Sequence, residues 1–190
     1  MFEKMELYAK DNNVPIMEKE GIEFLEKYIK EHNVKSILEI GTAIGYSAIR
    51  MSLIDDDIVV TTIERDNERY QEAVKNIDEF NLNDRIKLIY GDALEVEIEG
   101  FYDLIFIDAA KSQSIKFFNK YEKNLNKDGV IITDNINFHG LTFSKDKIES
   151  RNLRQLVRKI HEYLNFLEEN SEYTTKYLNI GDGLTISKRK

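Results

Sequence analysis

The sequence predicts an α/β fold in which helices cover both faces of a mostly parallel sheet. Short apolar runs alternate with amphipathic segments along most of the chain, as they do where strands and helices alternate. Two runs, at 103–111 and 131–135, end abruptly in acidic or amide side chains, which is typical of buried parallel strands followed by loops. The last two runs are joined so closely that an antiparallel pair is expected there.

The chain begins with two predicted helices, over 2–10 and 18–31. Pro15, the only proline, falls between them and indicates an extended break. We expect residues 1–31 to form helices or a lid beside the sheet. The five strands predicted next are Ser36–Ile40, Ile58–Ile63, Ile86–Tyr90, Tyr102–Ile107 and Val130–Thr133.

Amphipathic helices are expected in the connections between these strands. The helix after the second strand has an apolar face made of Tyr70, Ala73, Val74 and Ile77. A longer helix near the end has a face made of Leu153, Leu156, Val157, Ile160, Leu164 and Leu167. The chain then ends in two strands, Tyr173–Leu178 and Leu184–Lys188, and the turn at 179–183 predicts a hairpin.

Composition limits the class of protein. A chain of 190 residues suits one domain, 1–190, with a full core. It has no cysteine, which excludes disulfides, zinc–thiolate sites and thiol nucleophiles, and together with the lack of an apolar signal segment predicts a cytoplasmic location. No apolar run approaches the roughly 18 residues of a membrane span. The net charge of −8 argues against a general nucleic-acid binder but leaves room for a local basic patch.

Three oxygen donors are predicted at the carboxyl ends of two strands: Asp108, Asp134 and Asn135. Ligand crevices in open α/β sheets lie at those ends. Carboxylate and amide oxygens suit Mg²⁺ or a similar divalent cation, with water or substrate completing the coordination. The alternative is that these residues cap the helices that follow the strands. Capping explains either segment alone, but it does not explain why both carry such donors.

The turn after the first strand carries Glu39, Gly41 and Gly45, spaced Glu-x-Gly-x-x-x-Gly. A dinucleotide-binding turn would have three glycines spaced Gly-x-Gly-x-x-Gly. The acid before the first glycine would repel a diphosphate, yet it can hold the cationic amino group of an amino-acid ligand. Two glycines alone do not exclude a plain strand-to-helix turn.

Two further acids indicate which ligand this turn serves. Glu64 ends the second strand, where it can accept both hydroxyls of a ribose, and Asp92 follows the third, where it can accept the amine of adenine. Singly, each acid is more often a helix cap or a surface residue. Together with Glu39 they describe a site for an amine, a ribose and an adenine without phosphate, which is S-adenosylmethionine (SAM). A nicotinamide dehydrogenase is disfavoured by the missing third glycine and by Glu39.

These residues resemble a known family, the metal-dependent class I O-methyltransferases of the catechol and caffeoyl-CoA type. The resemblance is most specific at 38–47, 107–111 and 133–135, and it extends from Val14 to Leu184. The segments 40–47, 106–111 and 180–184 look like the bacterial branch that contains tRNA 5-hydroxyuridine methyltransferase. Ala110, Asn137 and His139 depart from residues common in relatives, and these departures concern the substrate rather than the chemistry.

The resemblance implies a Rossmann-like, seven-stranded sheet with an antiparallel last strand, and a SAM-dependent transfer of methyl to a hydroxyl. It implies cofactor contacts at Met17, Glu39, Gly41, Ser47, Glu64, Asp92, Ala93 and Asp108. Its metal ligands, for Mg²⁺ or another divalent cation, would be Asp108, Asp134 and Asn135. Lys111 would be catalytic beside Asp108, taking the proton of the hydroxyl or stabilising the oxyanion. We also expect a homodimer.

Two substrates suit this chemistry, because both offer two vicinal oxygens to a metal: a 5-hydroxyuracil and a catechol. A non-enzymatic protein that only senses SAM would leave Lys111, Asp134 and Asn135 without a purpose, whereas Lys111 alone would be taken for a solvated lysine. We expect His139 to line the substrate mouth. The leading substrate is 5-hydroxyuridine in the tRNA anticodon stem-loop, giving 5-methoxyuridine, and a small catechol-like molecule is the alternative.

A basic cluster favours the RNA substrate. Of its members, Arg151, Arg154 and Arg158 share one helical face, which suits contacts to phosphates. The alternative is an ordinary solvated helix face, because acidic residues are interspersed. The whole cluster comprises Lys145, Lys147, Arg151, Arg154, Arg158 and Lys159.

Overall fold

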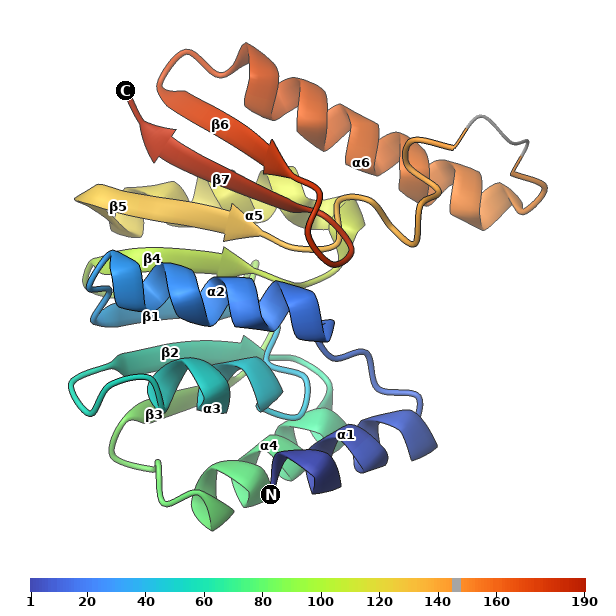
Figure 1. The fold of residues 1–190 in the computed structure, drawn as a ribbon. Helices are drawn as coiled ribbons and strands as arrows, with labels where there is room; N and C mark the ends of the chain where they lie inside the picture. The colour runs from blue at the N-terminus through green and yellow to red at the C-terminus, as the bar shows by residue number, and fades with distance from the viewer. Residues whose placement is uncertain (145–147) are drawn as a thin grey trace.

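The computed structural model of the protein, which describes residues 1–144 and 148–190, is built on one seven-stranded sheet (Figure 1). The strands lie in the order β3-β2-β1-β4-β5-β7-β6. Neighbouring strands from β3 to β5 are parallel, and β7 is antiparallel to both β5 and β6, as predicted. The strands are β1 Ser36–Ile40, β2 Val59–Glu64, β3 Ile86–Tyr90, β4 Tyr102–Ile107, β5 Leu125–Thr133, β6 Tyr173–Leu178 and β7 Leu184–Arg189.

Helices cover both faces of this sheet, which explains why its strands are apolar on both sides. Residues of α1, α2, α3 and α4 share one apolar layer, and residues of α5 and α6 share the other. Figure 1 shows α2 in front of the sheet and α5 behind it. The helices are α1 Phe2–Asp11, α2 Lys19–Glu31, α3 Tyr46–Ser52, α4 Asn67–Glu79, α5 Ser114–Tyr121 and α6 Arg151–Glu169, with 3₁₀ turns at Lys111–Gln113 (η1) and Glu122–Asn124 (η2).

The strand β5 is longer than the sequence predicted, because it begins at Leu125 rather than at Val130. Its first half is polar and partly exposed, so it lacks the apolar signature of a buried strand. A side chain holds this half in place, since Asn126 Nδ2 donates to Asp103 Oδ1 at 2.7 Å. The pairing of β4 with β5 is irregular between Tyr102 and Leu104, where that polar half joins the sheet.

Two residues assigned to apolar helix faces are exposed. Val74 is 40% exposed, whereas Ala73 and Ile77 beside it on α4 are buried. Leu153 is 37% exposed at the start of α6. The helix α4 packs near the β2–β3 edge of the sheet, and only a narrow strip of it meets the core. The predicted face was therefore too wide at Val74.

Candidate active site

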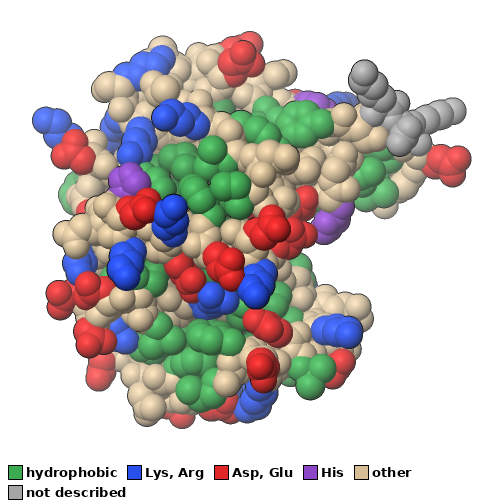
Figure 2. All heavy atoms as spheres, viewed as in Figure 1, with side chains coloured by type: hydrophobic (Ala, Val, Ile, Leu, Met, Phe, Trp, Pro, Cys, Tyr) green, Lys and Arg blue, Asp and Glu red, His purple; other side chains and the backbone are tan. Residues whose placement is uncertain are grey.

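A crevice of about 980 Å³ lies beyond the carboxyl ends of the parallel strands. Figure 2 shows the molecule hollowed on this side, where the arrows of β2 and β4 point in Figure 1. Two predicted site residues, Glu39 and Asp134, stand behind its lining and bond to residues in it, namely Ser47 and Asn135. His139 lines the crevice, as expected. The other predicted site residues in the lining are Met17, Gly41, Ser47, Glu64, Asp92, Ala93, Asp108, Lys111 and Asn135.

Glu39 is fully buried at the end of β1. Its carboxylate accepts hydrogen bonds from Ser47 Oγ and, at 2.5 Å, from Thr62 Oγ1. Burial raises the pKa of Glu39 to about 7, although both hydroxyls favour the charged form. A cationic group bound against Ser47 would stabilise the carboxylate, so this position suits an ammonium ligand.

Glu64 and Asp92 are oriented by backbone amides at the ends of β2 and β3. The two carboxylate oxygens of Glu64 accept from the N–H groups of Ala43 and Asp66, each at 2.8 Å. Each oxygen retains a second lone pair, so Glu64 can also accept from two ligand hydroxyls. Asp92 Oδ1 accepts from Leu94 N–H at 2.8 Å, which leaves Asp92 Oδ2 as a free acceptor apart from Arg65, 3.6 Å away.

Gly41 brings the turn after β1 against the end of β4. Its φ of +101° lies in the region that favours glycine. A Cβ built at Gly41 would lie 2.3 Å from the carbonyl oxygen of Asp108, so no other residue fits without a backbone shift. The loop with the cofactor-type residues therefore touches the strand end that carries Asp108.

The three predicted metal ligands and the predicted catalytic lysine form one cluster. Asp108 Oδ1 accepts from Lys111 Nζ and from Asn135 Nδ2, both at 3.0 Å. Asn135 Nδ2 also lies 3.2 Å from Asp134 Oδ2. Burial, together with the charge of Asp108, raises the pKa of Asp134 above its usual range. Residues from β4, η1 and β5 thus meet within hydrogen-bond distance.

This donor set fits a hard divalent cation. Among residues 1–144 and 148–190, no group of three or more His, Cys, Asp or Glu side chains is placed to hold a metal. Asn135 would serve as the third donor after rotation of its amide, which turns Oδ1 toward the carboxylates. Two carboxylates this close repel each other, and a divalent cation between them would offset that repulsion.

Comparisons with known proteins agree with this geometry. A family model described as O-methyltransferase matches residues 3–190. The chain belongs to the O-methyltransferase family. It is 43% identical to a candidate caffeoyl-CoA O-methyltransferase from Staphylococcus aureus, with a TM-score of 0.94 over 100% of this chain and 92% of that one. It is 26% identical to an O-methyltransferase from Bacillus cereus solved with SAH, with a TM-score of 0.83 over 100% and 90% of the two chains.

A curated relative extends the comparison to plants. The chain is 28% identical to a caffeoyl-CoA O-methyltransferase of Populus kitakamiensis over 175 residues, which are 87% of this chain and 74% of the relative. The fold, the family and these relatives identify the protein as a SAM-dependent O-methyltransferase. No helix in the described part of this O-methyltransferase is both long and apolar enough to cross a membrane.

Sequence reasoning missed several residues of the O-methyltransferase site. Thr62 and Thr42, whose hydroxyls are 2.6 Å apart, look like ordinary strand and turn residues in the sequence. Gln113 lines the crevice, and its buried Oε1 has no hydrogen-bond partner among the described residues. Asp182 lies far away in sequence but contacts the segment after Asn135. Only the Ile-Gly-Asp-Gly-Leu ending pointed to it.

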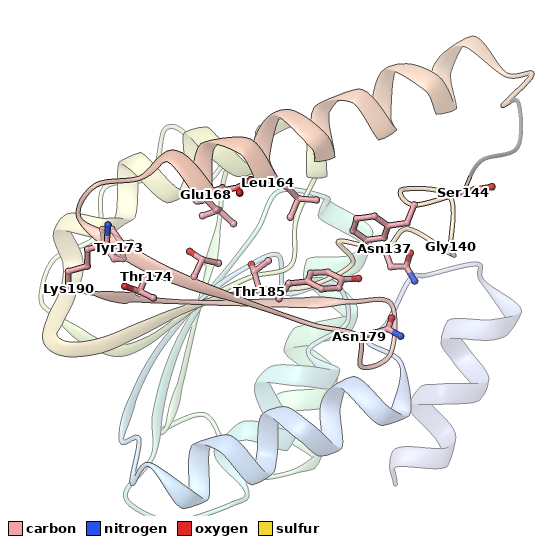
Figure 3. Close-up of a pocket in the computed structure, with 14 residues that line it drawn as sticks. Asn137, Gly140, Ser144, Leu164, Glu168, Tyr173, Thr174, Asn179, Thr185 and Lys190 are labelled. Carbon is pink, nitrogen blue, oxygen red and sulfur yellow. The ribbon is translucent and has the colours of Figure 1, made fainter.

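A second cavity of the O-methyltransferase, of about 1050 Å³, lies between α6 and the β6–β7 hairpin (Figure 3). It is lined mainly by Tyr, Thr, Phe and Leu side chains. None of the described residues that line it is a predicted site residue. The chemistry therefore belongs to the crevice.

The predicted basic cluster is partly used inside the protein. Arg154 Nη1 donates to the carbonyl oxygens of Ile148 and Glu149, both at 2.7 Å. Glu162 pairs with Arg158 and Lys159 at 3.3 and 2.6 Å. Arg151 is exposed, and Lys145 and Lys147 lie outside the described residues. Leu156 of the same helix lines the crevice, so the first half of α6 borders the site.

Proposed function

We propose that this O-methyltransferase uses Mg²⁺, or a similar divalent cation, held by Asp108, Asp134 and Asn135. Its substrate in this proposal is 5-hydroxyuridine in a tRNA anticodon stem-loop, and its product is 5-methoxyuridine. The observation that carries the proposal is the cluster of two carboxylates, an amide and Lys111 at the rim of the cofactor-type crevice. Such a cluster suits a substrate with two vicinal oxygens.

In this proposal the cofactor lies across the ends of β1, β2 and β3. Glu39, Ser47 and Gly41 hold its methionine end, with Met17 packed over it. Glu64 accepts from the ribose hydroxyls through the lone pairs that its backbone contacts leave free. Asp92 and the backbone of Ala93 hold the adenine. Asp108 joins the two halves, since it lies against Gly41 and within the polar cluster.

Transfer is an in-line displacement in which the substrate oxygen attacks the sulfonium methyl, the carbon–sulfur bond breaks and S-adenosylhomocysteine leaves. The bound cation would lower the pKa of the hydroxyl and fix its direction. Lys111 Nζ, 3.0 Å from Asp108, is placed to receive the hydroxyl proton when neutral, or to stabilise the oxyanion when charged. The enclosed strand ends hold the reactants close together.

The choice of an RNA base is supported by the start of α6. The exposed Arg151 and the partly paired Arg158 lie on the helix whose Leu156 lines the crevice, in a chain whose net charge is −8. Cations on this helix would attract a phosphate backbone that extends past the site. The alternative is a small catechol-like molecule, which is supported by the likeness to the plant caffeoyl-CoA O-methyltransferase.

Parallel assays test the proposal. The purified protein is given SAM, Mg²⁺ and either tRNA containing 5-hydroxyuridine or a catechol, with chelator controls. We expect metal-dependent methylation of the tRNA, and nucleoside mass spectrometry should show the loss of methoxyuridine from a deletion strain. Methylation of the catechol alone would favour the alternative. Full activity in excess chelator would remove the metal from the mechanism.

We also propose a homodimer. It is supported by the free edge of β6, the last strand of the sheet, and by Tyr177 and Phe143, which are 40% and 54% exposed with ring centroids 5.4 Å apart. Light scattering should give twice the mass of the chain, and a mass of one chain would contradict the proposal. The cytoplasmic location stays a prediction.

A further inference from the structure

The turn between β6 and β7 holds the segment that follows Asn135. The carbonyl oxygen of Gly183 accepts from Ile136 N–H at 3.0 Å, and that of Asp182 accepts from Asn137 N–H at 2.7 Å. The side chain of Asp182 adds a third bond, because its Oδ1 accepts from His139 N–H at 2.5 Å. Figure 3 shows Asn137 beside this turn, near Asn179. Two parts of the chain more than 40 residues apart are thus joined next to a predicted metal ligand.

The segment held in this way has an unusual backbone. Phe138, His139 and Gly140 have φ values of +47°, +54° and +81°, and Asn135 has +59°. Left-handed conformations at non-glycine residues cost on the order of 1 kcal/mol each and persist where the surroundings impose them. Of the three hydrogen bonds from the turn, the one from His139 N–H to Asp182 Oδ1 holds this left-handed stretch directly. The result is that Phe138 and His139 line the crevice that holds Asp108 and Lys111.

One oxygen of the Asp182 carboxylate is buried and has no hydrogen-bond partner among the described residues. This oxygen is Oδ2, and Asp182 as a whole is 5% exposed. A buried, unpaired carboxylate oxygen is costly, so its retention calls for a physical reason. His139 Nδ1 lies 3.7 Å from this oxygen, while the His139 side chain is 71% exposed. A small rotation of the imidazole would bring Nδ1 into hydrogen-bond range.

We propose that Asp182 is a positioning residue that holds His139 with its proton on Nδ1, so that Nε2 accepts a hydrogen bond from an N–H donor of the substrate. A carboxylate beside one ring nitrogen of histidine fixes which nitrogen carries the proton. Because Asp182 also fixes the backbone of His139, it sets both the place and the hydrogen-bonding character of the imidazole. His139 is then a specificity-determining residue of the substrate side.

This proposal rests on the proposed function, and it sharpens the choice of substrate. In 5-hydroxyuracil, the 5-hydroxyl and the 4-carbonyl form the vicinal oxygen pair, and the ring N3–H lies next to that carbonyl. A catechol presents only C–H bonds at the corresponding edge. An acceptor at His139 Nε2 therefore favours the uracil ring, because a site built to accept a hydrogen bond discriminates against a ring without a donor.

The proton position can be measured without any substrate. Nitrogen-15 NMR of the imidazole, at a mildly alkaline pH, distinguishes the two neutral tautomers of His139. We expect the Nδ1–H form in the parent protein. Asp182→Asn keeps the acceptor for His139 N–H but places an amide donor toward Nδ1, so the tautomer should switch to Nε2–H. The same tautomer in both proteins would overturn the proposal, whatever the substrate is.

Kinetics then separate recognition from folding. His139→Ala and Asp182→Asn should each raise KM for the hydroxyuridine substrate roughly five- to ten-fold, the scale of one lost hydrogen bond, with kcat and cofactor affinity little changed. The double variant should match His139→Ala alone. His161→Ala, at an exposed histidine on α6, is the control and should have no effect.

Three outcomes are distinguishable. If Asp182→Asn raises KM equally for tRNA and catechol and lowers the melting temperature, Asp182 has only a structural role, and the proposal is contradicted. An unchanged KM for the hydroxyuridine substrate in His139→Ala would also contradict it. Inactivity of the parent toward tRNA, with the expected tautomer switch intact, would instead refute the proposed substrate while leaving the Asp182–His139 pair in place.

Discussion

The two halves of the crevice are built differently. On the cofactor side, Glu39 and Glu64 lie at strand ends and are buried, and each receives two hydrogen bonds from neighbouring hydroxyls or amides. On the substrate side, Asp108 and Asp134 share Asn135, and the raised pKa of Asp134 reflects burial and their mutual repulsion. The segment beyond Asn135 is an irregular loop with three successive left-handed residues.

This difference shows where affinity and specificity are encoded. The cofactor acids are oriented by β1, β2 and the turns after them, so the fold itself prepares that half for one ligand. The substrate half depends on a loop and on the contact with the β6–β7 turn, so a few substitutions can change it while the fold persists. We therefore expect substitutions in the substrate half to lower turnover, and substitutions in the cofactor half to weaken cofactor binding.

The largest effect is expected on the substrate side. Asp134→Ala should lower turnover on the order of 100- to 1000-fold, because it removes a predicted metal ligand beside the reacting oxygen. Cofactor affinity, measured by calorimetry, should stay within about two-fold, since the side chain of Asp134 contacts Asn135 on the substrate side. Asp128→Ala, at an exposed site on β5, is the control. A comparable loss of cofactor affinity would contradict the separation of the two halves.

On the cofactor side, Glu39 should make stability depend on pH. Its native pKa of about 7 exceeds the ordinary value of 4.5, so between these values the folded state binds more protons than the unfolded state. Stability should therefore fall as pH rises through this range, by up to about 3 kcal/mol from Glu39.

Glu39→Gln removes this titration and tests it. Both proteins are unfolded in urea without cofactor. The free energy of unfolding of the variant, relative to that of the parent, should increase between about pH 5 and about pH 8. The variant should also bind SAM more weakly, because the amide has no charge to offer an ammonium group. A stability difference independent of pH would show that Glu39 is ionised in the folded protein throughout.

Glu64→Ala should weaken SAM binding by about 1–3 kcal/mol, the scale of charge-assisted hydrogen bonds to a ribose. Maximal turnover at saturating SAM should change less, which separates this residue from Asp134. Glu68→Ala, at an exposed site in the first turn of α4, should bind SAM normally. Unchanged SAM affinity accompanied by tight NAD binding would reverse the assignment of Glu64 to this cofactor.

The smallest effect is expected at the exposed arginines of α6. Arg151→Gln with Arg158→Gln should raise KM for tRNA and reduce the salt dependence of binding by somewhat less than one log–log unit for each lost phosphate contact. Arg154 is left intact because it bonds to the backbone before α6. Turnover of a free catechol should not change. If the variant has the same tRNA kinetics as the parent across a salt series, this surface is an ordinary solvated helix face that does not bind tRNA.

Much of this molecule was predictable from the sequence. Buried parallel strands appear in a sequence as apolar runs, and their carboxyl ends meet at one edge, so the sequence predicts Asp108, Asp134 and Asn135 together. In the structure Asn135 Nδ2 contacts both carboxylates, and Lys111 bonds to Asp108. The antiparallel pairing of β6 with β7 was predictable too, because a five-residue turn cannot contain a parallel crossover.

Tertiary structure decided what local pattern does not encode. The polar first half of β5 depends on a bond to Asp103 of β4, and the exposure of Val74 depends on where α4 meets the sheet edge. Neither is written in the segment concerned. In the same way, the Asp182 contact with His139 joins residues 43 apart, and the Arg154 bonds divert a cation from the predicted basic face. Periodicity and strand ends are local properties that a sequence displays, whereas these contacts exist only once the chain has folded.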